Sequence, residues 1–247
     1  MKILALIPAR MGSSRFPGKP LAKILDKPMI EHVYKNVEKC ELLTKTVVAT
    51  CDEEIFDFIK SINGQVVMTS DKHERASDRC AEALAVLEQD DNVLYDIVVM
   101  VQGDEPMTHP DMITEALTPM LENPEIVVTN LMGDITSDDE FDDRNCIKVV
   151  CDLENNALCF SREPIPTRRF GNVPMKKQVC VIPFTRKFLL KYTRLSPTPL
   201  EIAESVDMMR VLEHGEKVKM VPTKHHTYPV DTETDLARVE ELMRTIN

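Results

Sequence analysis

Short runs rich in valine and isoleucine alternate with helical patterns through the first hundred residues, and this alternation constrains the fold most. The runs of strand length are residues 2–8, 46–50, 65–68 and 96–101. The helical patterns between them are residues 29–41, 53–62 and 79–87. Strands joined by helices lie parallel, with the helices covering the sheet. The sequence therefore predicts an α/β fold with a mostly parallel sheet flanked by helices.

The second half of the chain has a less regular pattern. Its strand-like runs and helical patterns are residues 126–131, 147–150, 201–213, 217–221 and 233–244. Residues 162–177 hold three prolines and five basic residues, which predicts a long irregular arm. Such a segment is usually functional or makes subunit contacts. We interpret the chain as one domain, residues 1–247, with a subdomain inserted at roughly 130–200.

Composition excludes several classes of function. The chain has 247 residues and a net charge of −11 at pH 7, whereas a general nucleic-acid binder needs a basic face. No apolar stretch approaches the ~18 residues of a membrane span. The seven cysteines are scattered without a Cys-x-x-Cys pair, which argues against a zinc site or a disulfide framework. With no export signal in the opening residues, we expect a cytoplasmic protein.

The loop after the first strand carries the clearest chemical signal. Residues 9–20, Ala-Arg-Met-Gly-Ser-Ser-Arg-Phe-Pro-Gly-Lys-Pro, combine two glycines, two serines, two arginines and a lysine. Backbone N–H groups freed by glycine, together with fixed cations, can cradle a polyphosphate. The loop has neither the Gly-Lys-Ser/Thr end of a P-loop nor the Gly-x-Gly-x-x-Gly of a dinucleotide site. The alternative is a basic turn that binds nothing.

Two aspartates are candidate metal ligands. Asp104 lies in the loop 102–106, directly after a predicted strand, and ligands of open α/β sheets bind beyond the carboxyl ends of the strands. A carboxylate beside a phosphate cradle suits Mg²⁺. Asp231 precedes the closing helix, and two carboxylates can hold two metal ions around one in-line displacement. Alternatively, Asp104 caps the helix after Pro110, and Asp231 or Thr232 caps the last helix.

A third candidate is the segment His-Glu-Arg-Ala-Ser-Asp-Arg at residues 73–79. Its functional interpretation is recognition of a base and a phosphate by Arg75 or Arg79. The alternative is a simple helix start, with Ser77 or Asp78 as the N-cap.

These segments resemble the 3-deoxy-manno-octulosonate (KDO) cytidylyltransferases, the CMP-KDO synthetases, over nearly the whole chain. The matching stretches are IPARMGSSRFPGKPL, KPMIEHV, VVATCDEEI, VQGDEPM, IKVVCD, CFSREPIP, SPTPLE, RVLEHGEKV and VDTETDLARV. The resemblance implies a nucleotidyltransferase fold of GT-A-like type, with a smaller dimerisation subdomain that includes the arm. It also implies a homodimer that transfers CMP from CTP to an acidic acceptor with Mg²⁺ and releases pyrophosphate, in lipopolysaccharide biosynthesis.

The resemblance also implies roles for individual residues. Arg10 and Lys19 would hold the triphosphate, Asp104 and Asp231 would bind Mg²⁺, and Arg10, Lys19 and Asp104 would be catalytic. The implied nucleotide-binding residues are Ala9, Arg10, Gly12, Ser13, Ser14, Lys19, Arg75, Ser77, Arg79 and Gln102. The implied acceptor-binding residues are Gln102 near the sugar acid, Arg162 on its carboxylate, and Gln178, Phe184, Asp207 and Met208.

The chain departs from the family pattern mainly in its acceptor half. The family's His-x-Gly-Ile-Tyr-x-Tyr appears as Gln-Val-Cys-Val-Ile-Pro-Phe at residues 178–184, and its Glu-Gln-Leu-Arg appears as Asp-Met-Met-Arg at 207–210. In the nucleotide half, its His-Gln-Ser-Gly-Thr-Glu/Asp-Arg is altered at 73–79. A pocket built to hydrogen-bond sugar hydroxyls discriminates strongly through its donors. We therefore expect KDO or a variant of it as acceptor, with a small phosphonate, another acid or a non-catalytic nucleotide-binding scaffold as alternatives.

Overall fold

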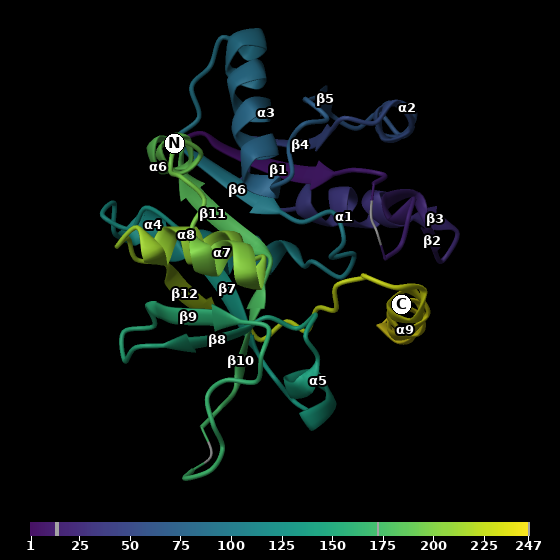
Figure 1. Ribbon diagram of the computed structural model, residues 1–247. Helices are drawn as coiled ribbons and strands as arrows, with labels where there is room; N and C mark the ends of the chain where they lie inside the picture. The colour runs from purple at the N-terminus through teal and green to yellow at the C-terminus, as the bar shows by residue number, and fades with distance from the viewer. Residues whose placement is uncertain (13–14, 172, 247) are drawn as a thin grey trace. The chain divides into compact units, whose positions relative to one another are not determined.

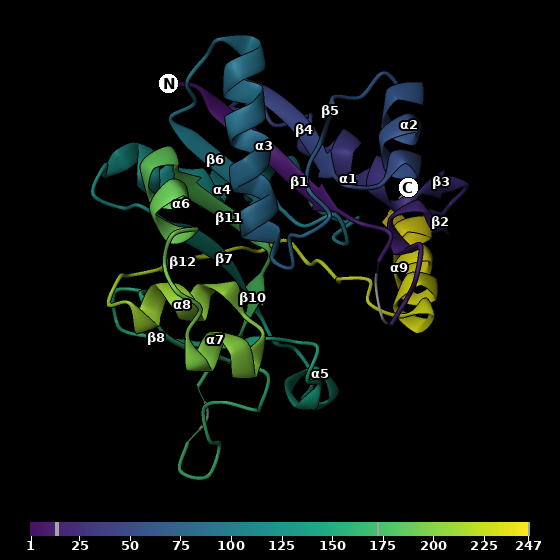
Figure 2. The same cartoon turned by 45° about the horizontal axis from the view of Figure 1, so that its top comes forward.

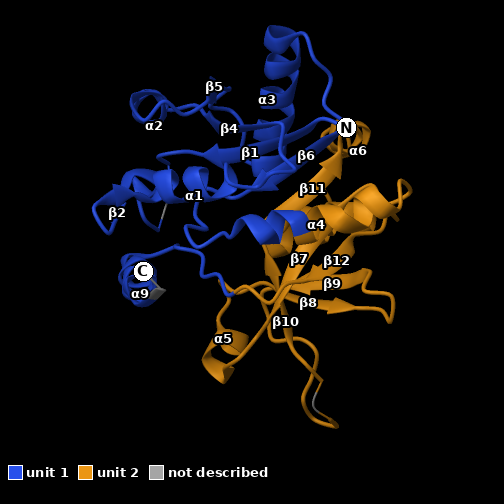
Figure 3. Cartoon of the chain, turned by 180° about the vertical axis from the view of Figure 1, so that it is seen from behind, with its two compact units in different colours: residues 1–114, 226–247 blue, residues 115–225 orange. Residues whose placement is uncertain are grey.

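The computed structural model describes residues 1–12, 15–171 and 173–246. The chain forms two compact units (Figure 3): residues 1–114 with 226–247 form unit 1, and residues 115–225 form unit 2. The segment 130–200, expected to be a subdomain, falls inside unit 2. Within the described ranges, no helix combines the length and apolar character needed to cross a bilayer.

Unit 1 is built on parallel strands. They are β1 (Ile3–Ala9), β4 (Lys45–Thr50), β5 (Val66–Met68) and β6 (Ile97–Val101), in the spatial order β6-β1-β4-β5. Every residue of β1 and β6 is buried, which is typical of parallel strands covered on both faces. The predicted mostly parallel α/β sheet is confirmed, with strand boundaries within one residue of those predicted.

Three helices connect these strands: α1 (Met29–Val37), α2 (Glu53–Ser61) and α3 (Ala76–Asp91). The path from β1 through β4 to β5 steps one way across the sheet, and α3 then returns to β6 on the other side of β1. Right-handed crossovers in opposite directions place their helices on opposite faces, as Figures 1 and 2 show for α1 and α3. The strand order therefore reverses between β1 and β6, where ligands of open sheets bind.

A second small core in unit 1 fixes the C-terminal helix. The short strands β2 (Lys23–Ile24) and β3 (Lys27–Pro28) pack near α9 (Glu233–Ile246), as Figure 2 shows. Ile24, Met29, Val230 and Val239 are fully buried together there, with Phe16 partly buried against them. This packing brings the residues before α9 next to the loop that follows β1.

Unit 2 contains a mixed sheet in the order β12-β7-β10-β8-β9. Its strands are β7 (Thr129–Asp134), β8 (Lys148–Cys151), β9 (Ala157–Ser161), β10 (Lys176–Val179) and β12 (Lys219–Pro222). The remaining elements are β11 (Val181–Thr185), α5 (Asp138–Asp142), α6 (Arg186–Tyr192), α7 (Pro199–Glu204) and α8 (Asp207–Glu213). One further helix, α4 (Pro110–Glu122), contains the chain boundary between the units.

Four elements differ from the predicted ones. The helix predicted over 29–41 ends four residues earlier, at Val37. The single helix predicted over 201–213 is two helices, because Ser205 adopts a left-handed conformation with φ of 53° and ends α7. The strand predicted over 126–131 lies three residues later, as β7. The helix predicted over 79–87 spans residues 76–91. The prediction is too short because the polar ends of this helix carry no apolar periodicity. The arm 162–177 has no helix or strand in its described part before β10 begins at Lys176.

A buried ion pair ties α7 to α8. The Arg210 guanidinium donates from Nε to Glu201 Oε2 at 2.7 Å and from Nη2 to Oε1 at 2.5 Å. The side chains are 5% and 0% exposed, and the guanidinium lies 4.6 Å from the ring centroid of Tyr192. Because both charges are desolvated, removing one partner leaves the other uncompensated.

We predict that Arg210→Met lowers the free energy of unfolding by about 3–5 kcal/mol, measured by urea denaturation of the full chain. The double variant Arg210→Met with Glu201→Gln removes the stranded charge and should recover much of that loss. A double variant as unstable as Arg210→Met would contradict this account of the pair.

Candidate active site

Lys19 joins two carboxylates that lie far apart in the chain. Its Nζ donates to Asp104 Oδ2 at 2.8 Å and to Asp231 Oδ1 at 3.1 Å. A second cation, Arg15, places Nη2 2.9 Å from the same Asp231 oxygen. All four residues belong to unit 1. The sequence prediction that the N-terminal cationic loop meets both aspartates describes this arrangement.

The loop between β1 and Lys19 is held at both ends. The Met11 N–H donates to Asp52 Oδ2 at 2.8 Å, which anchors the loop to the residue before α2. Gly18 adopts φ of +75°, a conformation that favours glycine, and its N–H donates to the Met11 carbonyl at 3.1 Å. The chain then enters a short 3-10 helix, η1 (Lys19–Leu21), so Lys19 projects from a defined turn.

Asp104 is positioned by close packing at the end of β6. A Cβ on the preceding Gly103 would lie 3.1 Å from the Pro8 carbonyl oxygen and 3.2 Å from Ile30 Cδ1, so a side chain would push its neighbours apart and this position favours glycine. The Asp104 carbonyl accepts the Val230 N–H at 2.9 Å. The loop after β6 and the segment before α9 are thus joined through the backbone.

The next residue adds a second connection between these segments. Glu105 is only 3% exposed, and one of its carboxylate oxygens accepts a hydrogen bond from the Thr227 hydroxyl. A buried carboxylate is tolerated when hydrogen bonds replace its lost hydration. This contact holds residues 227–231 against the Asp104 loop.

Asp231 is not the N-cap of α9. Thr232 Oγ1 accepts the Asp235 N–H at 3.2 Å, and Asp235 Oδ2 accepts the Thr232 N–H at 2.8 Å, the reciprocal pattern of a capping box. Of the two capping alternatives considered from sequence, the Thr232 one is therefore correct. The Asp231 carboxylate is free of the helix and faces the two cations.

The cluster is partly desolvated and electrostatically coupled. Burial alone lowers the pKa of Lys19, but the charges and hydrogen bonds of Asp104 and then Asp231 outweigh it, so the pKa of Lys19 lies above its ordinary value. Lys19 is therefore a permanent cation at neutral pH.

The two aspartates also fit a divalent metal ion. Their oxygens converge on one ammonium nitrogen, which stands where a small cation bridging them would be. Mg²⁺ takes one or two protein carboxylates and completes its octahedron with phosphate oxygens and water. Asp104 and Asp231 therefore supply a suitable donor set.

The other residues predicted to bind the nucleotide near these aspartates lie in different environments. Ala9 is the buried last residue of β1, and Gly12 is exposed. Arg10 is exposed at the start of the loop and forms no ion pair within the described part of the chain. Gln102, the first residue after β6, is partly buried. Ser13 and Ser14 lie outside the described residues.

A buried arginine at the start of α3 lacks one partner. Arg79 is 3% exposed, and its Nη1 donates to Thr69 Oγ1 at 2.5 Å and to the Ser70 carbonyl at 3.3 Å. Its Nη2 is buried without a hydrogen-bond partner among the described residues. An unsatisfied buried donor is costly, and a ligand oxygen would satisfy it.

The segment before α3 is held in place by Glu82. Its carboxylate accepts the Ser70 N–H at 2.9 Å and pairs with His73. Burial raises the pKa of Glu82, but these contacts outweigh it and leave the pKa below its ordinary value. The N-cap of α3 is Arg75, so the alternative of Ser77 or Asp78 as N-cap is wrong. Ser77 is instead fully buried in the first turn.

The predicted acceptor residues of unit 2 lie in different environments. Arg162 donates to backbone carbonyls, from Nε to Glu204 at 2.6 Å and from Nη1 to Arg144 at 2.9 Å. Gln178 Nε2 donates to Asn130 Oδ1 at 2.6 Å. Asp207, partly buried, opens α8.

Phe184 and Met208 differ from the other predicted acceptor residues because they are wholly buried. Phe184 packs against Tyr192 with ring centroids 6.2 Å apart. Neither side chain is open to a ligand, so we leave both out of the acceptor site proposed below.

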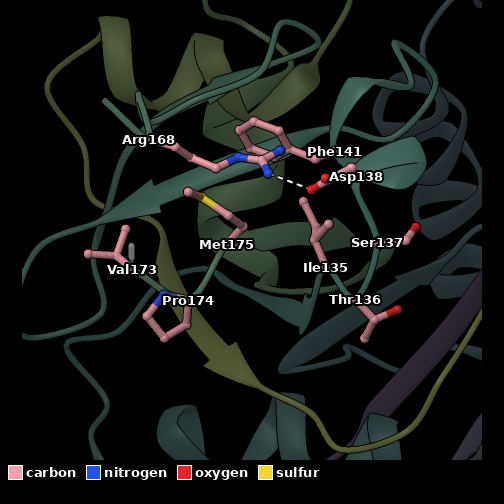
Figure 4. Close-up of a pocket in the computed structure, with 9 residues that line it drawn as sticks. All are labelled: Ile135, Thr136, Ser137, Asp138, Phe141, Arg168, Val173, Pro174 and Met175. Atoms are coloured by element: carbon pink, nitrogen blue, oxygen red, sulfur yellow. Dashed lines mark hydrogen bonds and ion pairs between the residues drawn. The ribbon is translucent and has the colours of Figure 1, made fainter. Parts of the chain in front are cut away.

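Unit 2 also has a hollow at the base of the arm (Figure 4). Arg168 reaches across it to pair with Asp138 at 2.5 Å and lies 4.0 Å above the Phe141 ring. These contacts tie the arm to α5, and the Arg168 guanidinium is already matched by a carboxylate and an aromatic face.

Sequence reasoning missed Arg15, Asp52 and Glu105 as parts of the site. Arg15 lies in the loop 9–20 and Glu105 in the loop 102–106, so both could have been found from their positions in these motifs. Asp52 lies two residues after the end of β4, at the same carboxyl edge of the sheet as the loops after β1 and β6. Its role in anchoring Met11 could have been found from that placement.

Cations and carboxylates gathered where the strand order reverses are an arrangement typical of nucleotidyltransferases. A family model described as cytidylyltransferase matches residues 4–218. The chain belongs to this cytidylyltransferase family.

Curated relatives match over almost their full length. A 3-deoxy-manno-octulosonate cytidylyltransferase from Geobacter metallireducens is 42% identical, covering 98% of this chain and 97% of the relative. One from Acaryochloris marina is 37% identical, covering 97% of this chain and 96% of the relative.

Among solved structures, a CMP:2-keto-3-deoxy-manno-octonic acid synthetase complexed with CTP superposes with a TM-score of 0.90. It is 34% identical to this chain and covers all of both chains. The sequence-based assignment to the CMP-KDO synthetase-like cytidylyltransferases is confirmed by these comparisons.

We predict that Thr227→Val lowers the free energy of unfolding by about 1–3 kcal/mol, because it leaves the buried Glu105 carboxylate without this donor. Chemical denaturation of the full chain measures the loss. Thr245→Val, the same exchange at an exposed position of α9, is the matched control. Equal stability of the two variants would contradict the role given to the Thr227 hydroxyl.

Proposed function

We propose that the chain transfers CMP from CTP to a 3-deoxy-ulosonic acid, KDO or a close variant, with Mg²⁺ as the metal. The observation that carries the proposal is the convergence of Lys19, Asp104 and Asp231 at the reversal of strand order. Full-length similarity to enzymes named for this reaction supports it. The acceptor oxygen forms a bond to the α-phosphorus of CTP, the bond between the α- and β-phosphates breaks, and pyrophosphate leaves.

The side chains divide the work between binding and charge neutralisation. Arg10 and Lys19 hold the triphosphate, and their charges oppose the negative charge of its oxygens during in-line displacement. Asp104 and Asp231 hold Mg²⁺, which when bound supplies further neutralisation and orientation of the phosphates. Positioning the two reactants accounts for most of the remaining catalysis, and no protein nucleophile takes part.

Recognition of the nucleotide involves the start of α3. The buried Nη2 of Arg79 offers a donor that lacks a partner among the described residues, and an oxygen of the nucleotide would accept it. We also assign to nucleotide binding Arg75 and Ser77, which lie just before Arg79 in the sequence, and Gln102, which follows β6. Gly12, and Ser13 and Ser14 outside the described residues, complete the proposed phosphate loop with Ala9.

Within unit 2, the residues assigned to the acceptor are Arg162, Gln178 and Asp207. Arg162 offers a guanidinium for the acceptor's carboxylate, after release of the carbonyls that it now contacts. An amide at Gln178 in place of the family's histidine favours an acceptor that differs from KDO in one polar group. The protein works as a cytoplasmic homodimer through unit 2, whose arm exposes Phe170 and Val173.

We predict that the purified chain releases pyrophosphate from CTP in the presence of Mg²⁺ and a 3-deoxy-ulosonic acid. Phosphate release through a coupled pyrophosphatase measures the rate over KDO, modified ulosonic acids and phosphonates. EDTA should abolish the reaction, and excess Mg²⁺ should restore it. UTP or ATP in place of CTP should support little turnover. A folded sample that is inactive with every acceptor would contradict the proposal.

We predict that Asp104→Asn lowers kcat at least about a hundredfold while the chain stays folded, because a neutral amide weakens the metal site and the reaction depends on charge neutralisation. Asp96→Asn is the matched control, since Asp96 lies just before β6 and Asp104 lies just after it. Steady-state kinetics and circular dichroism of both variants test the prediction. Full activity of Asp104→Asn would contradict the need for a carboxylate charge at this position.

A further inference from the structure

Without a metal ion, the site already contains its own positive charges. The carboxylates of Asp104 and Asp231 carry two negative charges, and Lys19 and Arg15 bring two positive charges within 3.1 Å of them. The Lys19 side chain is only 12% exposed, so this neutralisation takes place with little help from water. The cluster is therefore electrically balanced as it stands.

A divalent cation cannot simply be added to this cluster. Mg²⁺ lies about 2.0–2.1 Å from its oxygen ligands, whereas the Lys19 ammonium lies 2.8 Å from Asp104 Oδ2. An ion bound to that same oxygen would lie within a few ångströms of the ammonium, where like charges repel strongly in a partly desolvated site. Movement of the ammonium away from these oxygens would remove that repulsion.

The construction of the site favours movement of the cations over movement of the acids. Asp104 is fixed through its carbonyl by Val230, and Asp231 donates its N–H to the capping-box residue Asp235. Lysine, in contrast, carries its charge on a flexible four-carbon stem, and the Arg15 side chain is 47% exposed. A triphosphate offers new anionic partners for both cations.

We propose that Lys19 and Arg15 are internal counter-ions that compete with the divalent cation for Asp104 and Asp231 until a nucleoside triphosphate takes over the two cationic side chains. This inference rests on the proposed function of the site. It makes Arg15 a positioning residue for the metal carboxylates. It also makes the binding of metal and nucleotide mutually dependent, because each ligand relieves a charge imbalance created by the other.

The test measures Mn²⁺ binding to the nucleotide-free full-length chain by the electron paramagnetic resonance signal of free Mn²⁺. Lys19→Met should bind Mn²⁺ about tenfold or more tightly than the wild type, because losing one partly buried counter-ion leaves excess negative charge. Arg15→Gln should show a smaller gain in the same direction. Lys45→Met is the matched control, since Lys45 pairs with Asp91 at the opposite, amino end of β4 and its loss should leave Mn²⁺ affinity unchanged.

Unchanged or weaker Mn²⁺ binding by Lys19→Met would overturn the inference. If that variant fails to fold by circular dichroism, Arg15→Gln decides alone: tighter binding supports competition, and equal binding overturns it. Wild-type turnover of CTP together with unchanged Mn²⁺ affinity in the variants would refute the competition and leave the proposed function standing. Tighter Mn²⁺ binding by the variants, together with no turnover of CTP by the wild type, would support the competition and contradict the proposed function.

Discussion

One ammonium group organises the site, because Lys19 is the point at which three distant segments meet. Two carboxylates brought close together repel unless a cation lies between them. Lys19 provides that cation, so the loop after β1, the loop after β6 and the segment before α9 can share one small volume. The close packing at Gly103, the hydrogen bond from Thr227 to Glu105 and the capping box of α9 hold the segments that carry Asp104 and Asp231.

The same constraint explains where the site is. Unit 1 reverses its strand order between β1 and β6, and the carboxyl ends of the strands at such a reversal are where ligands of open sheets bind. The nucleotide half is therefore determined largely by sheet topology and by a few fixed charges. The proposed acceptor residues of unit 2 are polar side chains, and Gln178 stands where the family pattern described above has a histidine.

The parts predicted correctly from sequence are those that local patterns determine. The Val/Ile-rich runs have a clear period, and they gave the strands of unit 1 within a residue. The meeting of Lys19 and Asp104 could be predicted because they lie in the loops that follow β1 and β6. Patterns failed where tertiary context decides the outcome. The left-handed Ser205 splits a helix that looks continuous, and the burial of Phe184 and Met208 depends on packing between elements of unit 2.

The central claim is that Asp104 and Asp231 form one metal site beside the cations of the N-terminal loop. Anomalous diffraction from crystals grown with Mn²⁺ and CTP tests it most directly. The account predicts anomalous density within coordination distance of both aspartates, with the Lys19 nitrogen moved from the carboxylates to a phosphate oxygen. Manganese bound away from both aspartates, with Lys19 still bridging them in the presence of CTP, would contradict it.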